Sequence, residues 1–296
     1  MRFVSMSCIT SKPHSCTAAV LPVTSERISS DGSIALRVRK YIGTVGLPLI
    51  GIALVFVLWQ VAALTMRSSQ VPSPLDTLIA IPRDWQQIPA IAYFTFAESG
   101  LADALVYTTV NVVVGVAIGS LAGVLVGIVM AYARLARAVL EPIVLVLGTI
   151  PLVVILPFLM IWFGTDRFAQ SGLVILSAFV TTAITAQSAA MTVGRVYADY
   201  ARSLGATPLR ILSSVTLPAV VPQLVGAVRL SLAAGWGWQA VAELLGGSAG
   251  IGQLIRLTAN TGAVDSIFAT ILCITVIALI VDAIVLLLGR AITRWA

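Results

Sequence analysis

The sequence predicts an all-α membrane protein, with six transmembrane helices and a polar helical segment between the fourth and fifth. Three observations indicate this class. Of the 296 residues, 59% are hydrophobic and 10% are charged. The mean hydropathy is +1.03, and values of this kind lie outside the range of soluble domains. The apolar residues also gather in blocks long enough to cross a hydrocarbon core, which takes about 20 helical residues.

The first 41 residues form a polar segment that we expect to be a disordered, uncleaved cytoplasmic tail. It is rich in serine and threonine and has no sustained apolar run, so it is a poor match to a signal peptide. Residues 42–296 form the predicted membrane domain. Its predicted spans are Ile42–Thr65, Ala104–Tyr132, Leu140–Phe163, Ser171–Met191, Val220–Leu245 and Ile267–Leu288.

Basic residues predict the orientation, because lysine and arginine are enriched in cytoplasmic loops. With the amino terminus inside, the inner segments contain 13 basic residues and the outer loops contain four. We therefore expect a multi-pass protein of the cell's inner membrane with both termini in the cytoplasm. The net charge of +6 is better explained by this loop bias than by nucleic-acid binding.

Two outer connectors have unusual compositions. Met66–Asp103 contains four prolines, which favour extended segments and turns, so we expect an ordinary connector or, as the alternative, a contact with a substrate-delivery protein. Gly246–Ser266 is rich in glycine and weakly apolar. It is either an outer loop or a short re-entrant helix.

Glycine and proline mark two of the predicted spans. The second has glycine at every fourth position from Gly115 to Gly127, which predicts close helix packing within the bundle rather than self-association. The third contains Pro151 and Pro157, each of which removes a backbone donor and favours a kink. The kinked helix either lines a transport path or is a static feature of the bundle.

Ionisable residues are rare in the predicted spans and mark candidate functional positions. Arg229 and Glu243 lie in the fifth span and Asp282 lies in the sixth. The first two are 14 residues apart, about 21 Å along a helix, so they cannot pair. Arg229 either reaches toward the membrane surface, caps helix carbonyls or attracts an anion. Glu243 is a gate element or an interfacial carboxylate. The candidates for a translocation path are Arg229, Glu243 and the two prolines of the third span, Pro151 and Pro157.

A charged stretch within residues 195–218 separates two long apolar blocks. Residues 197–218 read YADYARSLGATPLRILSSVTLP, and the small-residue turn from Gly205 to Pro208 predicts a helix, a turn and a second helix. The simpler interpretation is an amphipathic helix at the membrane surface.

This stretch resembles the EAA loop of the membrane subunits of bacterial ATP-binding cassette importers. Asp199-Tyr200-Ala201 stands at the Glu-Ala-Ala triplet, Gly205 at the glycine, Val215 at the isoleucine and Leu217-Pro218 at the final pair. Three residues depart from the family pattern: Asp199 replaces glutamate and keeps the charge, Tyr200 replaces a small alanine, and Val215 replaces isoleucine. The resemblance implies a coupling helix that docks on an ATPase subunit. The residues it implicates are Tyr197, Asp199, Tyr200, Ala201, Arg202, Gly205, Ala206, Leu217 and Pro218.

Other segments, among them IPLVVILPFLMIWFG at 150–164 and AVRLSLAAGWGWQAVAELL at 227–245, are similar to permeases of the nitrate, sulfonate and taurine branch. The resemblance covers about residues 45–290. It implies a second permease copy, most simply an identical one, a pair of ATPase subunits and an extracytoplasmic solute-binding protein. The implied solute is a small anion such as a sulfonate, taurine or nitrate.

The chain itself has little material for catalysis. Its two lysines do not end a phosphate-binding loop, so we expect no enzyme activity and no bound cofactor, with ATP and magnesium on the partner ATPase. Three scattered cysteines and one histidine predict neither a disulfide framework nor a metal site. Two alternatives remain: an ion-coupled secondary transporter that uses Glu243 and Asp282, and a membrane scaffold without transport activity.

Overall fold

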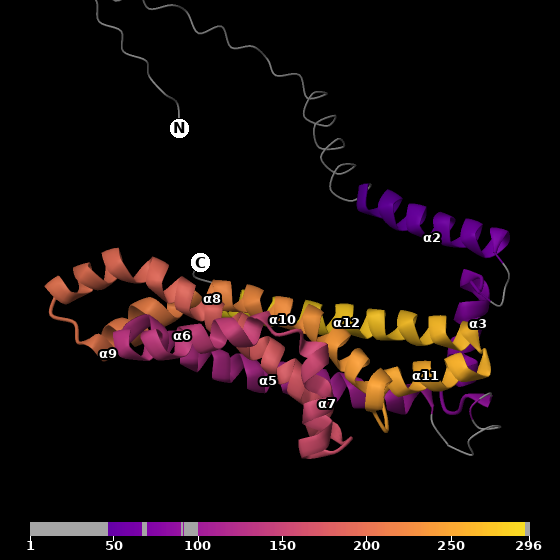
Figure 1. The fold of residues 1–296 in the computed structure, drawn as a ribbon. Coiled ribbons are helices and arrows are strands. Elements are labelled where there is room, and N and C mark those ends of the chain that lie inside the picture. Colours follow the sequence, from indigo (N-terminus) through magenta and orange to yellow (C-terminus); the bar gives the residue numbers. More distant parts are fainter. Residues whose placement is uncertain (1–46, 67–69, 90, 92–99, 294–296) are drawn as a thin grey trace, which may run out of the picture. The chain divides into compact units, whose positions relative to one another are not determined.

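The computed structural model describes residues 47–66, 70–89, 91 and 100–293, and these are helical or lie in turns and connections (Figure 1). The predicted tail, residues 1–41, lies outside them. The helices are α2 (Leu47–Thr65), α3 (Pro74–Asp84), α5 (Leu101–Tyr132), α6 (Arg134–Thr149), α7 (Leu152–Phe163), α8 (Arg167–Ser203), α9 (Pro208–Ile211), α10 (Leu217–Gly246), α11 (Ile251–Thr261) and α12 (Val264–Ile292). The all-α prediction is confirmed.

The chain divides into two units after Val55. Of the first unit, the structure describes the first turns of the apolar helix α2, and the side chains of residues 48–55 are exposed. The second unit, Phe56–Ala296, holds all the other described helices. Within it, α9 lies at one end of the helix bundle, and α3 and α11 lie at the other (Figure 1). The two ends therefore present different surfaces.

The second unit is organised by a close contact between α5 and α8. The four regularly spaced glycines of α5 are buried. A methyl group on Gly119, Gly123 or Gly127 would collide with a backbone carbonyl of α8, namely that of Ile175, Phe179 or Ala183 respectively. The glycine face therefore packs within the bundle, as the sequence predicts, and brings two helix backbones together.

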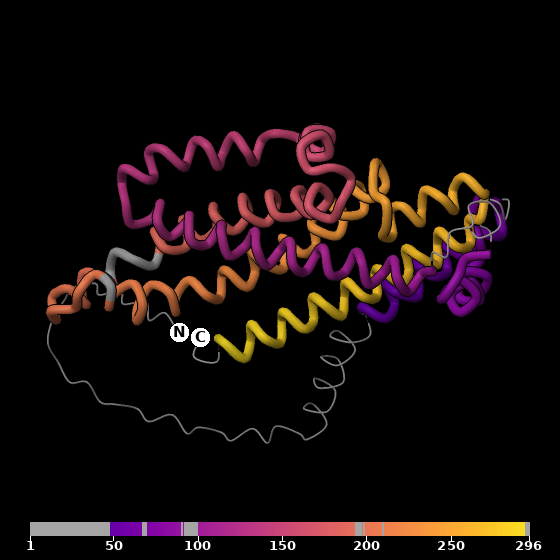
Figure 2. Tube along the Cα trace, turned by 90° about the horizontal axis from the view of Figure 1, so that it is seen from below, coloured from indigo at the N-terminus to yellow at the C-terminus, as the bar shows by residue number. Residues whose placement is uncertain are grey.

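The predicted third span is broken. Five described helices are long and apolar enough to cross a membrane, and α6 and α7 together make a sixth span only if a bend of 99° is allowed. Figure 2 shows the bend, with α6 across the view and α7 nearly end-on. Pro151 precedes α7 and Ile150 before it has extended backbone dihedrals, as expected for a residue that precedes proline. Pro157 lies inside α7. The six predicted spans hold only if this bent pair counts as one.

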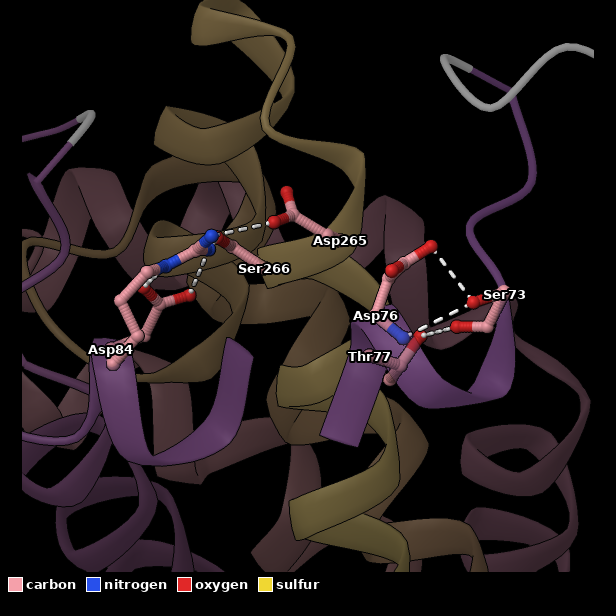
Figure 3. Close-up of polar contacts among 7 residues, drawn as sticks. Ser73, Asp76, Thr77, Asp84, Asp265 and Ser266 are labelled. Atoms are coloured by element: carbon pink, nitrogen blue, oxygen red, sulfur yellow. Dashed lines mark hydrogen bonds and ion pairs between the residues drawn. The ribbon is translucent and has the colours of Figure 1, made fainter. Parts of the chain in front are cut away.

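The two connectors predicted to be outer loops both contain a helix. The prolines of residues 66–103 favour extended segments and turns, and the structure adds the short helix α3 among them. Pro74 occupies its first turn, and Ser73 caps it by accepting a hydrogen bond from the Asp76 backbone N–H at 3.1 Å (Figure 3). The glycine-rich segment contains α11, the helical one of the two alternatives. Gly250 and Gly262 flank it with positive φ values of 97° and 72°, which favour glycine.

A charged cluster ties α3 to the start of α12 (Figure 3). The Arg83 guanidinium contacts the Asp84 carboxylate at 2.8 Å and the Asp265 carboxylate at 2.8 Å, and donates to the Ser266 hydroxyl at 3.0 Å. The side chain of Asp84 is almost fully buried. The hydrogen bond to Asp84 is the main cause that raises the pKa of Arg83 above its ordinary value, although burial opposes it. Arg83 therefore stays charged and compensates the buried Asp84.

We predict that Arg83→Ala lowers the free energy of unfolding by about 1–3 kcal/mol, because it leaves the buried Asp84 carboxylate without its cation. Thermal unfolding of the purified chain in detergent measures this loss. The double variant Arg83→Ala/Asp84→Asn should recover part of it, and Arg290→Ala, an exposed arginine of α12, should change little. An unfolding temperature unchanged by Arg83→Ala would contradict the role given to this cluster.

Candidate functional site

The polar segment predicted between two spans forms the tip that joins α8 to α10. Its first half is not a separate helix, because α8 continues without a break to Ser203. The chain turns at Gly205, which has a φ of +80°. The Gly205 N–H donates to the Arg202 carbonyl at 2.9 Å and the Ala206 N–H to the Ala201 carbonyl at 3.0 Å. The predicted glycine turn is thus present, and it closes the carboxyl end of α8.

The outgoing side of the tip is exposed. Tyr197, Tyr200 and Leu204 have 66%, 69% and 74% of their surfaces accessible, and Asp199 forms an exposed ion pair with Arg202 at 2.6 Å. Such an ion pair contributes little to stability. Three large apolar or aromatic side chains beside a charged pair make a surface suited to a protein partner, since aromatic residues are enriched at interfaces. We call Tyr197, Asp199, Tyr200, Arg202 and Leu204 the tip surface.

The returning side of the tip is anchored. α9 and a π-helical turn, Leu212–Thr216, lead into α10 at Leu217. The side chain of Ile211 is buried, and the hydroxyls of Tyr132 and Thr216 share a hydrogen bond. Of the other residues named for this segment, Ala201, Ala206 and Pro218 are half-buried and Leu217 is exposed over 36% of its surface. The tip therefore combines an exposed outgoing face with a packed return.

A second polar site lies toward the far end of α10, around Glu243. Its side chain has 0% exposure, so it lies inside the bundle rather than at its surface. The carboxylate accepts hydrogen bonds from the Thr108 hydroxyl at 2.9 Å, from the Gln239 amide at 2.9 Å and from the Gly252 backbone N–H at 3.0 Å. The Ile251 N–H in turn donates to the Thr108 hydroxyl at 3.0 Å. The site thus joins α5, α10 and α11.

The geometry of Glu243 depends on the glycines that begin α11. A Cβ on Gly250 or Gly252 would collide with atoms of Glu243, so only glycine lets the backbone approach the carboxylate this closely. A helix amino terminus favours a negative group, and a buried carboxylate requires hydrogen-bond donors. The hydrogen bond from the Gly252 N–H to the Glu243 carboxylate meets both requirements, because Gly252 lies in the first turn of α11. Glu243 therefore fixes the start of α11 against α5 and α10.

The third polar site is an ion pair between α10 and α12. The Arg229 guanidinium donates to both carboxylate oxygens of Asp282, at 2.8 and 2.7 Å. Sequence reasoning named both residues but missed the pair. One signal was present: Arg229 lies 12 residues after the start of α10 and Asp282 lies 10 residues before the end of α12, about 18 and 15 Å of helix. Antiparallel neighbours at similar depth bring such charges together.

The four path candidates do not form one site. Arg229 and Glu243 lie 14 residues apart on the continuous helix α10, and Arg229 bonds to Asp282 instead. Pro151 lies at the break before α7, and Pro157 lies within that helix. α7 packs near Glu243 through a cluster that includes Leu156 and Ala242. Whether these residues line a path stays a prediction.

We predict that Glu243→Ala loosens α11, because it leaves the Gln239 amide and the Gly252 N–H without an acceptor. The expected loss is about 1–3 kcal/mol of unfolding free energy. Hydrogen exchange of residues 251–261 measures it locally, and exchange there should speed up more than in α5. Glu141→Ala on α6 is the control, since Glu141 makes no side-chain hydrogen bond to the described residues. Unchanged exchange in α11 would refute the anchoring role.

Comparison with known proteins places these features in a family. A family model described as the binding-protein-dependent transport system inner membrane component matches residues 119–294. The taurine transport system permease protein TauC of Escherichia coli K12 is 30% identical over 166 residues, 56% of this chain and 60% of that protein. The putative aliphatic sulfonates transport permease protein SsuC of Bacillus subtilis 168 is 31% identical over 156 residues, 53% and 56% of the two chains. The chain thus spans somewhat more than half the length of these relatives.

Two kinds of solved transporter share the fold. A chain of the MetNI methionine ABC transporter, in an inward-facing conformation, superposes with a TM-score of 0.53 at 24% identity, over 64% of this chain and 93% of that one. A chain of a bacterial ABC transporter involved in the import of the acidic polysaccharide alginate gives a TM-score of 0.57 at 16% identity, over 89% and 95%. At these identities the likeness concerns the fold alone.

Proposed function

Because the chain belongs to the family of binding-protein-dependent transport system inner membrane components, we propose that it is the membrane-spanning permease subunit of an ATP-driven importer. It is not itself the ATPase. ATP and magnesium bind to a separate pair of ATPase subunits, an extracytoplasmic protein delivers the solute, and a second permease copy, identical in the simplest assembly, completes the path. Sequence similarity to the permease proteins TauC and SsuC supports this assignment.

The tip surface is the observation that carries the coupling role. It follows the glycine turn spacing of an EAA loop, exposes Tyr197, Tyr200 and Leu204, and lies directly on the continuous helix α8. Closure of the ATPase pair pushes on this tip, and α8 and α10 carry the displacement into the bundle, which switches the path between inward-facing and outward-facing states. In this orientation α9 and both chain termini face the cytoplasm.

The solute proposed is a small anion or an anion-bearing solute such as a sulfonate, taurine or nitrate. The similarity to TauC, a taurine transport permease, and to SsuC, a putative aliphatic sulfonates transport permease, supports this class. The ion-coupled alternative has less support, because Asp282 is paired with Arg229 and Glu243 is held by three donors. Neither carboxylate is therefore an open site for a coupling ion in this conformation.

The proposal is tested by purifying the carboxyl-terminally tagged chain gently from its native membrane and identifying the proteins that co-elute. We expect a stoichiometric ATPase subunit that is lost from the double variant Asp199→Lys/Gly205→Val. Gly226→Ala, a change on α10 with no neighbouring atom in reach of the added methyl group, should keep it. A chain that elutes alone and moves solute into vesicles without ATP would overturn the importer assignment.

We further predict that Gly205→Val alone reduces uptake about tenfold or more while the chain still inserts into the membrane. Gly205 has a φ of +80° with open space around it, so valine is disfavoured by the backbone rather than by a neighbour. Such strain costs on the order of 1–3 kcal/mol and shifts the tip away from its docking geometry. Uptake of labelled taurine and the amount of protein in the membrane are measured together. Normal uptake at normal protein levels would contradict coupling through this turn.

A further inference from the structure

A pocket of about 440 Å³ opens where the first turns of α5 and α8 meet the segment before α11. Its polar lining includes Asp103 and Tyr107 from α5, Arg167 from α8, and Ser248 and Gln253. We infer that this pocket binds a small zwitterion, with its anionic head group on Arg167 and its ammonium group on Asp103. This inference rests on the proposed importer function and specifies the chemical class of its solute.

Arg167 is held in place yet keeps its hydrogen-bonding capacity. Its guanidinium lies over the Tyr107 ring, 4.5 Å from the ring centroid. The Tyr107 hydroxyl donates to the Gln170 side-chain oxygen at 3.3 Å, and the Gln170 amide donates to the Thr165 carbonyl at 2.9 Å. Across the part of the chain that the structure describes, Arg167 itself forms no hydrogen bond or ion pair. Its N–H groups are therefore available to a carboxylate or sulfonate.

The place of Arg167 in its helix also points to a ligand. It is the first residue of α8, where the helix dipole is positive and a cation is disfavoured. Asp166 precedes it as the N-cap residue of α8, but no carboxylate of the described residues forms an ion pair with the exposed Arg167 side chain. An anion bound at the pocket would supply the missing compensation from outside the chain.

Asp103 supplies the opposite charge on another wall of the pocket. It lies in the first turn of α5, a favourable position for a carboxylate. No described residue pairs with it, and it does not pair with Arg167. Two unlike charges held apart on the walls of one pocket match a molecule that carries both charges. A plain anion would leave Asp103 uncompensated and feel its repulsion, so the pocket discriminates against it.

The rest of the pocket wall includes the start of α11, and the pocket is of suitable size. Gly250 lines it and lies against Glu243, which anchors α11. The backbone N–H groups of Ile251 and Gly252 are already bonded to Thr108 and Glu243, so recognition falls to Arg167 and Asp103. Small-molecule sites occupy about 300–1,000 Å³. The segment before α11 lines the pocket, and α11 lies toward the end of the bundle away from α9 (Figure 1). In the proposed orientation this is the side where solute arrives.

The test is equilibrium binding of labelled taurine to the full chain in lipid nanodiscs, without binding protein or ATP. Three unlabelled competitors distinguish the contribution of the anionic group from that of the ammonium group. They are taurine itself, β-alanine, which has a carboxylate in place of the sulfonate, and ethanesulfonate, which lacks the ammonium. We expect taurine and β-alanine to compete, and ethanesulfonate to be about ten times weaker or more. Taurine alone competing would restrict the site to aminosulfonates. Equal competition by ethanesulfonate would overturn the role of Asp103.

Two variants assign the charges. Arg167→Gln should weaken taurine binding about ten- to a hundredfold, and Asp103→Asn should weaken taurine to the level of ethanesulfonate. Arg134→Gln, an exposed arginine at the start of α6, is the matched control. Wild-type affinity in Arg167→Gln, or no saturable binding in the parent chain, would refute the pocket. The thermal unfolding temperature of each variant confirms that it is folded.

Failure of this inference is separable from failure of the importer assignment. The ATPase that co-elutes with the parent chain should also co-elute with Arg167→Gln and Asp103→Asn, because the pocket and the tip lie at opposite ends. Co-elution of the ATPase without taurine binding would support the importer assignment and refute the zwitterion pocket. Taurine binding without a co-eluting ATPase would support the pocket and refute the coupling proposal.

Discussion

The close approach of α5 and α8 is the constraint on which the rest of the second unit depends. Apolar side chains gain little from leaving lipid for another helix, so packing in a membrane relies on surfaces that fit closely. The glycines of α5 let the α8 backbone come within contact of its own. Both helices carry functional groups beyond the contact: α8 extends into the tip surface, and α5 supplies Thr108 and Asp103. The contact between α5 and α8 therefore positions the tip surface as well as Thr108 and Asp103.

Polar groups within the bundle are compensated in two different ways. Glu243 uses neutral donors, including the amino terminus of α11, and remains hidden. Arg229 and Asp282 use each other and stay partly accessible, at 38% and 35% of their side chains. A buried carboxylate surrounded by donors fixes an element in place, whereas an ion pair with partly accessible side chains costs less to separate than a fully buried one. The first arrangement suits an anchor and the second suits a position that adjusts during a conformational change.

The sequence predicts what depends on local pattern. Apolar blocks, packing glycines and the turn at Gly205 can be predicted from the sequence alone, because each reflects the preferences of residues that are near one another in the chain. The 99° break at Pro151 was underestimated, since proline predicts a kink but not its size, which depends on what α7 packs against. The short helix α3 was not predicted, because four prolines in the segment favour turns, although Pro74 stands where a helix accepts proline. The Arg229–Asp282 pair required knowing which helices are neighbours.

The two ends of the bundle are joined by one continuous helix. α10 runs without a break from Leu217, at the return of the tip, to Gly246, just past Glu243, about 45 Å at the helical rise. Pro222 lies inside α10 near the tip, and the proposed coupling has a displacement at the tip pass along this continuous helix to the start of α11. Because Gly250 belongs both to that anchor and to the pocket lined by Arg167 and Asp103, the same displacement alters the pocket wall. In the proposed importer, ATPase closure and solute affinity would then be linked reciprocally: a solute that prefers one arrangement of α11 favours the corresponding arrangement of the tip.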